Sequence, residues 1–155
     1  MSESVTSPAP RHLRETNDDC EKLTIIKSEA FHLIAAKILH VIKRARPYLE
    51  TAVNRMCTRV SKSDLDFWKK LRRVISFIKV TIDDKRIICT KSLSAIFIWV
   101  NTAHAVNPDM KSQTGGTMTM GIGVMYGKCS NQKLNVKSST EVELGGFSDY
   151  FSCNI

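Results

Sequence analysis

The stretch SQTGGTMTMGIGVMYGKCSNQKLNVKSSTEVEL (112–144) decides the fold class, because its pattern is that of strands followed by a helix. β-Branched and other apolar residues recur in residues 117–126, and a second extended run covers residues 132–137. Both runs are typical of strands. The Thr-Gly-Gly sequence at 114–116 predicts a turn before them. We therefore expect a small antiparallel sheet in this part of the chain.

A helix is expected to begin within SSTE (138–141). Ser139 or Thr140 caps it, and acids in its first turn suit the positive end of the helix dipole. Gly145 and Gly146 weaken the helix by about 1 kcal/mol each relative to alanine. The predicted order in the C-terminal part is therefore strands followed by one helix.

Three amphipathic helices are predicted upstream of this sheet. Apolar residues recur at helical spacing in residues 28–46 and 48–60, and Pro47 separates the two helices. The third helix begins at Ser63, which resembles a capping box with Asp66. Its basic residues are expected on the side away from the apolar stripe.

The period of the pattern changes after Asp83 and Asp84, which are interpreted as a turn. Short runs at 86–90 and 95–100 then have the composition of strands. The fold class predicted is α+β. The expected parts are a flexible lead-in (1–24), a basic helical segment (25–85) and an incomplete antiparallel sheet with one helix (86–155).

Positive charge is concentrated in the helical segment. The chain has a formal net charge of +8, and residues 37–79 hold 12 basic residues against three acids, which leaves +9 in this block. Such a block indicates either a nucleic-acid-binding surface or a solvated helix face that keeps the protein in solution. The candidate phosphate-binding residues are Lys43, Arg44, Arg46, Lys69, Lys70, Arg72 and Arg73.

The cysteines indicate a reducing compartment. They form no CxxC motif or Cys/His cluster, so a zinc site is not expected. We interpret them as reduced thiols of a cytoplasmic or nuclear protein that is not secreted. The N-terminus lacks the pattern of a signal peptide, and no apolar run is long enough to cross a bilayer. The five are Cys20, Cys57, Cys89, Cys129 and Cys153.

Two parts of the chain resemble copia-type retrotransposon polyproteins. Residues 31–60 and 66–83 resemble the thumb or connection region that follows the polymerase palm of these reverse transcriptases. The segment WVNTAHAVNPDMKSQTGGTMTMGIGVMYGKCSNQKLNVKSSTEVEL (99–144) resembles the first part of their ribonuclease H domain. Its most specific motifs are SQTGG (112–116) and QKLNVKSSTEVEL (132–144). The resemblance implies a thumb-like helical segment followed by a truncated ribonuclease H-like domain.

The resemblance also implies which residues would carry catalysis. The parent activities are RNA-directed DNA synthesis and cleavage of RNA in RNA–DNA hybrids, with Mg²⁺ held by carboxylates. The paired aspartates of the polymerase palm precede the matching segments. The first ribonuclease H carboxylate falls on Asn101, which is neutral, and Glu143 matches the second. Glu143 is therefore a vestigial metal ligand, and we expect neither a bound cofactor nor catalysis by this chain alone.

Three hypotheses for the function follow. The chain is an inactive polyprotein segment, a nucleic-acid-binding module that uses its basic helices without reading sequence, or a subunit whose missing strands come from a partner. Asn101 argues against the third, because it would remain neutral in a completed domain. Without a further strand beside it, the strand at 95–101 would present an open edge, which predicts self-association.

Overall fold

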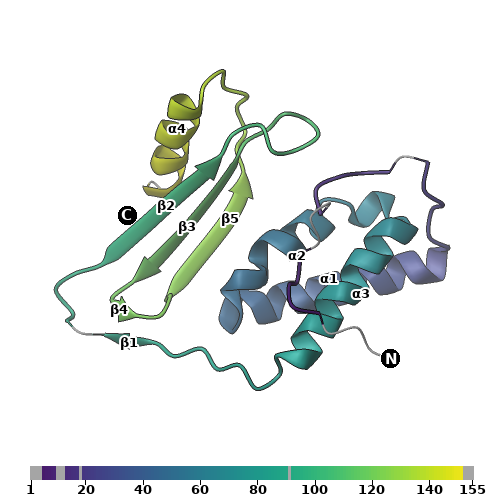
Figure 1. Ribbon diagram of the computed structural model, residues 1–155, viewed down its shortest axis with the longest axis horizontal. Helices are drawn as coiled ribbons and strands as arrows, with labels where there is room; N and C mark the ends of the chain where they lie inside the picture. Colours follow the sequence, from purple (N-terminus) through teal and green to yellow (C-terminus); the bar gives the residue numbers. More distant parts are fainter. Residues whose placement is uncertain (1–4, 10–12, 18, 91, 152–155) are drawn as a thin grey trace. The chain divides into compact units, whose positions relative to one another are not determined.

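The computed structural model describes residues 5–9, 13–17, 19–90 and 92–151 of the 155-residue chain. The chain divides into two units, residues 1–85 and residues 86–155. The first unit is helical, and the second contains antiparallel strands and a helix (Figure 1). The predicted α+β fold class is therefore confirmed. No helix within the described residues is long and apolar enough to cross a membrane.

Helices that alternate apolar and polar faces build the first unit. They are α1 (Ile25–Arg44), the 3-10 helix η1 (Pro47–Leu49), α2 (Glu50–Cys57), the 3-10 helix η2 (Val60–Lys62) and α3 (Leu65–Val80). The apolar stripe of α1 includes Phe31, Ala35, Ile38 and Ile42, which are buried at helical spacing. Pro47 begins η1, where its missing N–H costs nothing.

The start of α3 differs from the prediction by one residue. The helix is capped by Asp64, whose carboxylate accepts the backbone N–H of Phe67 at 2.8 Å. Ser63 instead places its hydroxyl 2.9 Å from that of Ser28 on α1. Asp66, the expected partner in a capping box, forms an ion pair elsewhere on α3. A carboxylate immediately before the helix also interacts favourably with the helix dipole, which accounts for the choice of Asp64.

The predicted flexible lead-in falls partly on residues 1–4, 10–12 and 18, which lie outside the described residues. The described residues in this range pack against the helices. Leu13 is buried in the core of the first unit. The backbone carbonyls of Ser7 and Glu15 accept hydrogen bonds from Arg73 and Lys70 of α3. Composition alone suggested a loose segment because a single buried leucine leaves no periodic signal.

The second unit contains two antiparallel sheets. Strand β3 lies between β2 and β5 in a three-stranded sheet, and β1 pairs with β4 in a separate ladder (Figure 1). β2 and β5 are therefore the outer strands of the larger sheet. The elements are β1 (Cys89–Thr90), β2 (Phe97–Ala103), β3 (Gln113–Thr119), β4 (Gly121–Ile122), β5 (Tyr126–Asn131) and α4 (Ser139–Phe151).

Three predictions in this unit are wrong. The single strand expected at 117–126 is divided among the end of β3, β4 and the first residue of β5. The Thr-Gly-Gly sequence at 114–116 lies inside β3, where the Gly115 and Asn101 positions are paired, and forms no turn. Residues 132–137 are not a strand, because β5 ends at Asn131. The glycine at 116 serves close packing: a Cβ there would collide with the ring of Tyr150 on α4. Glycine is thus used for the approach of a helix and not for a turn.

Helix α4 lies along one face of the β2–β3–β5 sheet (Figure 1). Its buried residues Val142, Gly146 and Tyr150 are spaced by four and share one face. A Cβ on Gly146 would collide with the methyl group of Thr102, which is paired with Thr114 across β2 and β3. Helix α4 therefore runs over the junction of these two strands, and glycine allows its backbone to approach them.

Candidate functional site

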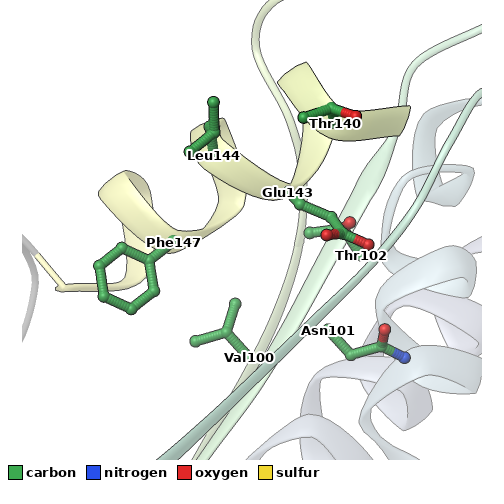
Figure 2. Close-up of a pocket in the computed structure, with 7 residues that line it drawn as sticks. All are labelled: Val100, Asn101, Thr102, Thr140, Glu143, Leu144 and Phe147. Atoms are coloured by element: carbon green, nitrogen blue, oxygen red, sulfur yellow. The ribbon is translucent and has the colours of Figure 1, made fainter. Parts of the chain in front are cut away.

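A hollow of about 350 Å³ lies between α4 and the outer strand β2. Asn101 and Glu143, the two residues implicated in catalysis by sequence, both line it. The structure thus brings together positions that are 42 residues apart in the chain. The complete lining is Val100, Asn101, Thr102, Thr140, Glu143, Leu144 and Phe147 (Figure 2).

The side chains of Asn101 and Glu143 nevertheless lie on different sides of β2. Thr102 faces α4, because it would contact a Cβ on Gly146. Successive strand residues alternate between faces, so the side chain of Asn101 points away from α4. Figure 2 shows Thr102 on the helix side of the strand, beside Glu143, and Asn101 on the other side. An acid at position 101 would therefore reach Glu143 only around the open edge of β2.

The two acids of TEVEL (140–144) have separate roles. Ser138, directly before α4, accepts the backbone N–H of Glu141 at 3.2 Å. The carboxylate of Glu141 in turn accepts the backbone N–H of Lys137 at 3.0 Å. The helix cap is therefore Ser138 and not Ser139 or Thr140, while the prediction that Glu141 serves the helix start is confirmed. Glu143 is left exposed at the hollow.

A buried glutamine that the sequence did not single out fixes α4 on the sheet. The Gln132 amide donates to the hydroxyl of Thr114 at 3.0 Å and to the carbonyl of Val142 at 2.8 Å. Its backbone N–H donates to the carbonyl of Ser112 at 2.8 Å. Gln132 therefore ties the strand end, β3 and the first turn of α4 together. Its position inside the motif QKLNVKSSTEVEL was the only sequence signal.

The donor set of the hollow does not fit a pair of Mg²⁺ ions. Glu143 is the only carboxylate among the described residues that line it. Among all the residues that the structure describes, no three His, Cys, Asp or Glu side chains gather closely enough to hold a metal. Hard divalent cations need several anionic oxygens, and the amide of Asn101 adds no charge. We therefore derive no metal-dependent step from this site.

Lys70, predicted to bind phosphate, is instead a buried structural residue. Only 2% of its surface is exposed. Its ammonium group forms an ion pair with Asp66 at 2.7 Å and donates to the carbonyl of Glu15 at 2.9 Å. It also lies 4.5 Å from the centre of the Phe67 ring. Desolvation of a lysine requires such partners, and the Asp66–Lys70 spacing of four was the signal that could have found them.

Arg46 is also structural, with 7% of its surface exposed. Its guanidinium donates to the hydroxyl of Tyr48 at 3.0 Å and to the hydroxyl and carbonyl of Thr81. A further bond reaches the carbonyl of Ile82 at 3.1 Å. Thr81 is the C-terminal cap of α3, so Arg46 places a cation at the negative end of that helix. These bonds and its burial argue against the phosphate-binding role that the sequence predicted for Arg46.

Three further cations predicted to bind phosphate, on α1 and α3, each make a contact within the first unit. Lys43 forms an ion pair with the buried carboxylate of Glu50. Arg44 is exposed, and its guanidinium lies 3.1 Å from Nδ1 of His40. Arg73 donates to the carbonyl of Ser7 at 3.1 Å. These contacts use some of the N–H donors that were predicted from the sequence to bind phosphate.

An exposed basic surface lies on α3: the α3 basic face, defined as Lys69, Arg72, Ser76 and Lys79. The spacings of three, four and three place these residues on one side of the helix. From Lys69 to Lys79 the face is about 15 Å long, given a rise of about 1.5 Å per residue. Within the described part of the chain, its cations form no ion pair with an acid. This face has the size and charge to contact a polyanion.

Cys57 is the described cysteine whose chemistry is altered by its surroundings. It packs against the core of the first unit. Burial raises the pKa of its thiol, because the thiolate is less well solvated there. Cys89, by contrast, is exposed. Cys57 is therefore a packing residue and a poor nucleophile.

Comparison with known proteins gives no assignment: no family model matches the sequence, and no solved structure matches the fold.

Proposed function

We propose that this chain is a segment of a copia-type retrotransposon polyprotein that spans the join of reverse transcriptase and ribonuclease H and does not cleave RNA by itself. The supporting observation is the hollow under α4, where a neutral Asn101 and a single carboxylate, Glu143, occupy the positions that the family resemblance assigns to metal ligands. The order of helices, antiparallel strands and a final helix agrees with that proposal. The cytoplasmic or nuclear location expected from the cysteines belongs to the same proposal.

Cleavage of a labelled RNA–DNA hybrid in Mg²⁺ or Mn²⁺ tests the proposal. We expect no product above the level of the Glu143→Gln variant, because one carboxylate cannot hold a metal pair. Asn101→Asp is the matched gain-of-charge variant, and it should also remain inactive, because the side chain points to the other face of β2. Metal-dependent cleavage by the wild-type protein that Glu143→Gln abolishes would refute the proposal.

A second function, sequence-independent binding of nucleic acid, is supported by the α3 basic face. A duplex strand carries one phosphate per about 3.4 Å along its axis, so a face about 15 Å long spans about four phosphates. Lys69, Arg72 and Lys79 can neutralise phosphates, and the Ser76 hydroxyl can donate to a phosphate oxygen. The binding surface proposed here is thus smaller than the seven residues expected from the sequence.

Fluorescence anisotropy of a labelled RNA–DNA hybrid across a salt series tests this binding. Replacement of Lys69, Arg72 and Lys79 by Gln should make the slope of log affinity against log salt less steep by about 2–3. The matched control replaces Lys22, Lys27 and Lys37, which are exposed in the same unit, and removes the same charge. Equal losses in both triple variants would mean that only net charge matters and would refute a defined binding face.

A further inference from the structure

Among the residues that the structure describes, the outer strand β2 is paired on one side only, and exposed apolar side chains flank its other edge on both faces of the sheet. Phe97 and Trp99 lie on the face away from α4, because they alternate along β2 with Val100, which faces α4. Trp99 is 65% exposed. On the other face, α4 holds Leu144, 68% exposed, and Phe147, 55% exposed, beside the hollow. A strand edge that combines free backbone groups with apolar surface is a template for another strand.

We propose that this edge is an interface between two copies of the chain, joined by antiparallel pairing of β2 with β2 of the second copy. One register pairs all seven residues of Phe97–Ala103, and it places Val100 opposite itself on a two-fold axis. In that register Ile98 lies opposite Thr102 of the second copy. The two three-stranded sheets then form one continuous sheet of six strands.

The hollow under α4 fits this pairing. Val100 and Thr102 face α4, and by strand alternation so does Ile98. Ile98 and Val100 of the second copy would then lie beside Thr102 and Val100 of the first, next to the hollow of about 350 Å³. Leu144 and Phe147 provide apolar walls for them (Figure 2). An apolar strand side chain fills space that water otherwise occupies, which favours association.

The placement of α4 leaves room for both helices. Because Gly146 sits over the Thr102–Thr114 pair, α4 lies about half a strand spacing inside β2. The two-fold axis lies half a spacing outside β2. With strands about 4.8 Å apart, the two α4 helices would be about 10 Å apart, within the usual distance for packed helices. A helix centred over β2 itself would have excluded the pairing.

The facing residues of the two helices also complement each other. Leu144, Phe147 and Phe151 lie on one side of α4 at spacings of three and four, and the rings of Phe147 and Phe151 stack with centroids 5.4 Å apart. Phe147 lies beside Val100 in Figure 2, so it falls near the two-fold axis. Antiparallel helices then bring Phe147 against Phe147 of the second copy, and Leu144 against Phe151.

The surface available is close to the area that a specific dimer buries. Phe97, Trp99, Phe147 and Phe151 are each between 44% and 65% exposed. An aromatic side chain contributes about 150–250 Å², so these four offer about 300–500 Å² per copy. Two copies, with Leu144 and the strand backbone added, approach the total of about 1,000 Å² that a specific interface needs.

Sedimentation velocity of the full chain across the micromolar range tests the interface. We expect a reversible, concentration-dependent species of twice the 17.4 kDa chain mass. Phe147→Glu should weaken association about tenfold or more, because it places two carboxylates near the axis. Leu134→Glu is the matched control, since Leu134 is 74% exposed and lies outside β2 and α4. Its dissociation constant should not change.

A cysteine scan then tests the register. Val100→Cys should give a disulfide-linked dimer on mild oxidation, because the residue on the axis faces its own copy, whereas Ile98→Cys should not. Peptide mass spectrometry identifies the linked positions. A monomer at all concentrations would overturn the proposal, as would a dimer that Phe147→Glu leaves intact. Growth into larger aggregates without a dimer plateau would also overturn it, because two-fold pairing closes on itself.

Discussion

Adjacent lysines on α3 allow burial and phosphate binding to be separated. Lys69 is exposed, whereas Lys70 is 2% exposed and bonded on three sides. Lys69→Ala and Lys70→Ala change the same residue type on the same helix, so differences in helix propensity cancel between them. The structure predicts that Lys70→Ala destabilises the first unit strongly and that Lys69→Ala does not.

The contacts of Lys70 set the magnitude. Loss of a charged hydrogen bond to the carbonyl of Glu15 costs about 1.5–3 kcal/mol. The ion pair to Asp66 adds less than about 1 kcal/mol, because the Asp66 side chain is 26% exposed and keeps contact with water. The contact with the Phe67 ring adds about 0.5–2 kcal/mol. These effects overlap, so we expect a loss of about 2–4 kcal/mol for Lys70→Ala and less than about 0.5 kcal/mol for Lys69→Ala.

Urea unfolding followed by tryptophan fluorescence measures this difference. The chain has two tryptophans, Trp68 in the first unit and Trp99 in the second, so a Trp99→Phe background reports on the first unit alone. Hybrid binding below the unfolding transition gives the second readout. There, Lys69→Ala should reduce the salt slope by about 1 and Lys70→Ala should leave it unchanged. Equal shifts of the unfolding midpoint, or a loss of salt slope in folded Lys70→Ala, would refute the reasoning.

Three further predictions concern packing and reactivity. Gly146→Ala should destabilise the second unit by about 1–3 kcal/mol despite the better helix propensity of alanine, because its Cβ would collide with Thr102; an unchanged urea midpoint would contradict this. Gln132→Ala should cost about 1–3 kcal/mol and speed amide hydrogen exchange at the start of α4, since a buried carbonyl loses its donor; unaltered exchange would contradict it. Cys57 should react with iodoacetamide more slowly than Cys89 in mildly alkaline solution, because burial raises its pKa; equal rates by mass spectrometry would oppose that assignment.

The same pKa shift has a consequence for stability. Burial favours the neutral thiol of Cys57 in the folded protein, so its pKa is higher there than in the unfolded chain. The contribution of the neutral Cys57 thiol to the stability of the fold is therefore fully present below the pKa of the unfolded chain. It is lost as the pH rises through the higher pKa of the folded protein. Cys57→Ala should flatten this alkaline loss in urea melts, and an unchanged pH dependence would contradict the assignment.

The sequence predicted those features that depend on local periodicity. Apolar spacing located α1 and α3, and the change of period after Asp84 located the start of the unit that contains the strands. It failed for Gly116, because a glycine in a turn and a glycine beneath an aromatic ring have the same local sequence. The ring belongs to Tyr150, 34 residues later. Likewise, the periodicity of α3 placed Lys70 with the solvent-facing cations, since the burying contact comes from a carbonyl at Glu15.

The candidate site was predictable in position but not in orientation. The family resemblance related Asn101 to Glu143, and both line one hollow. Which face of β2 carries the Asn101 side chain depends on the register with β3, and a shift of one residue would reverse it. That register is fixed by the pairing of Thr102 with Thr114 under Gly146. No local pattern in the sequence specifies such a three-way contact.

The motifs that carry the family resemblance mostly perform structural work in this chain. In SQTGG, Thr114 binds Gln132 and Gly116 accommodates Tyr150. In QKLNVKSSTEVEL, Gln132 binds the carbonyl of Val142, and the serine and first acid of SSTE cap α4. These contacts require specific residues at specific positions whether or not RNA is cleaved. Similarity confined to such motifs therefore supports a shared fold more strongly than a shared reaction. The catalytic inference depends on the few residues outside that packing, and among them position 101 is a neutral asparagine.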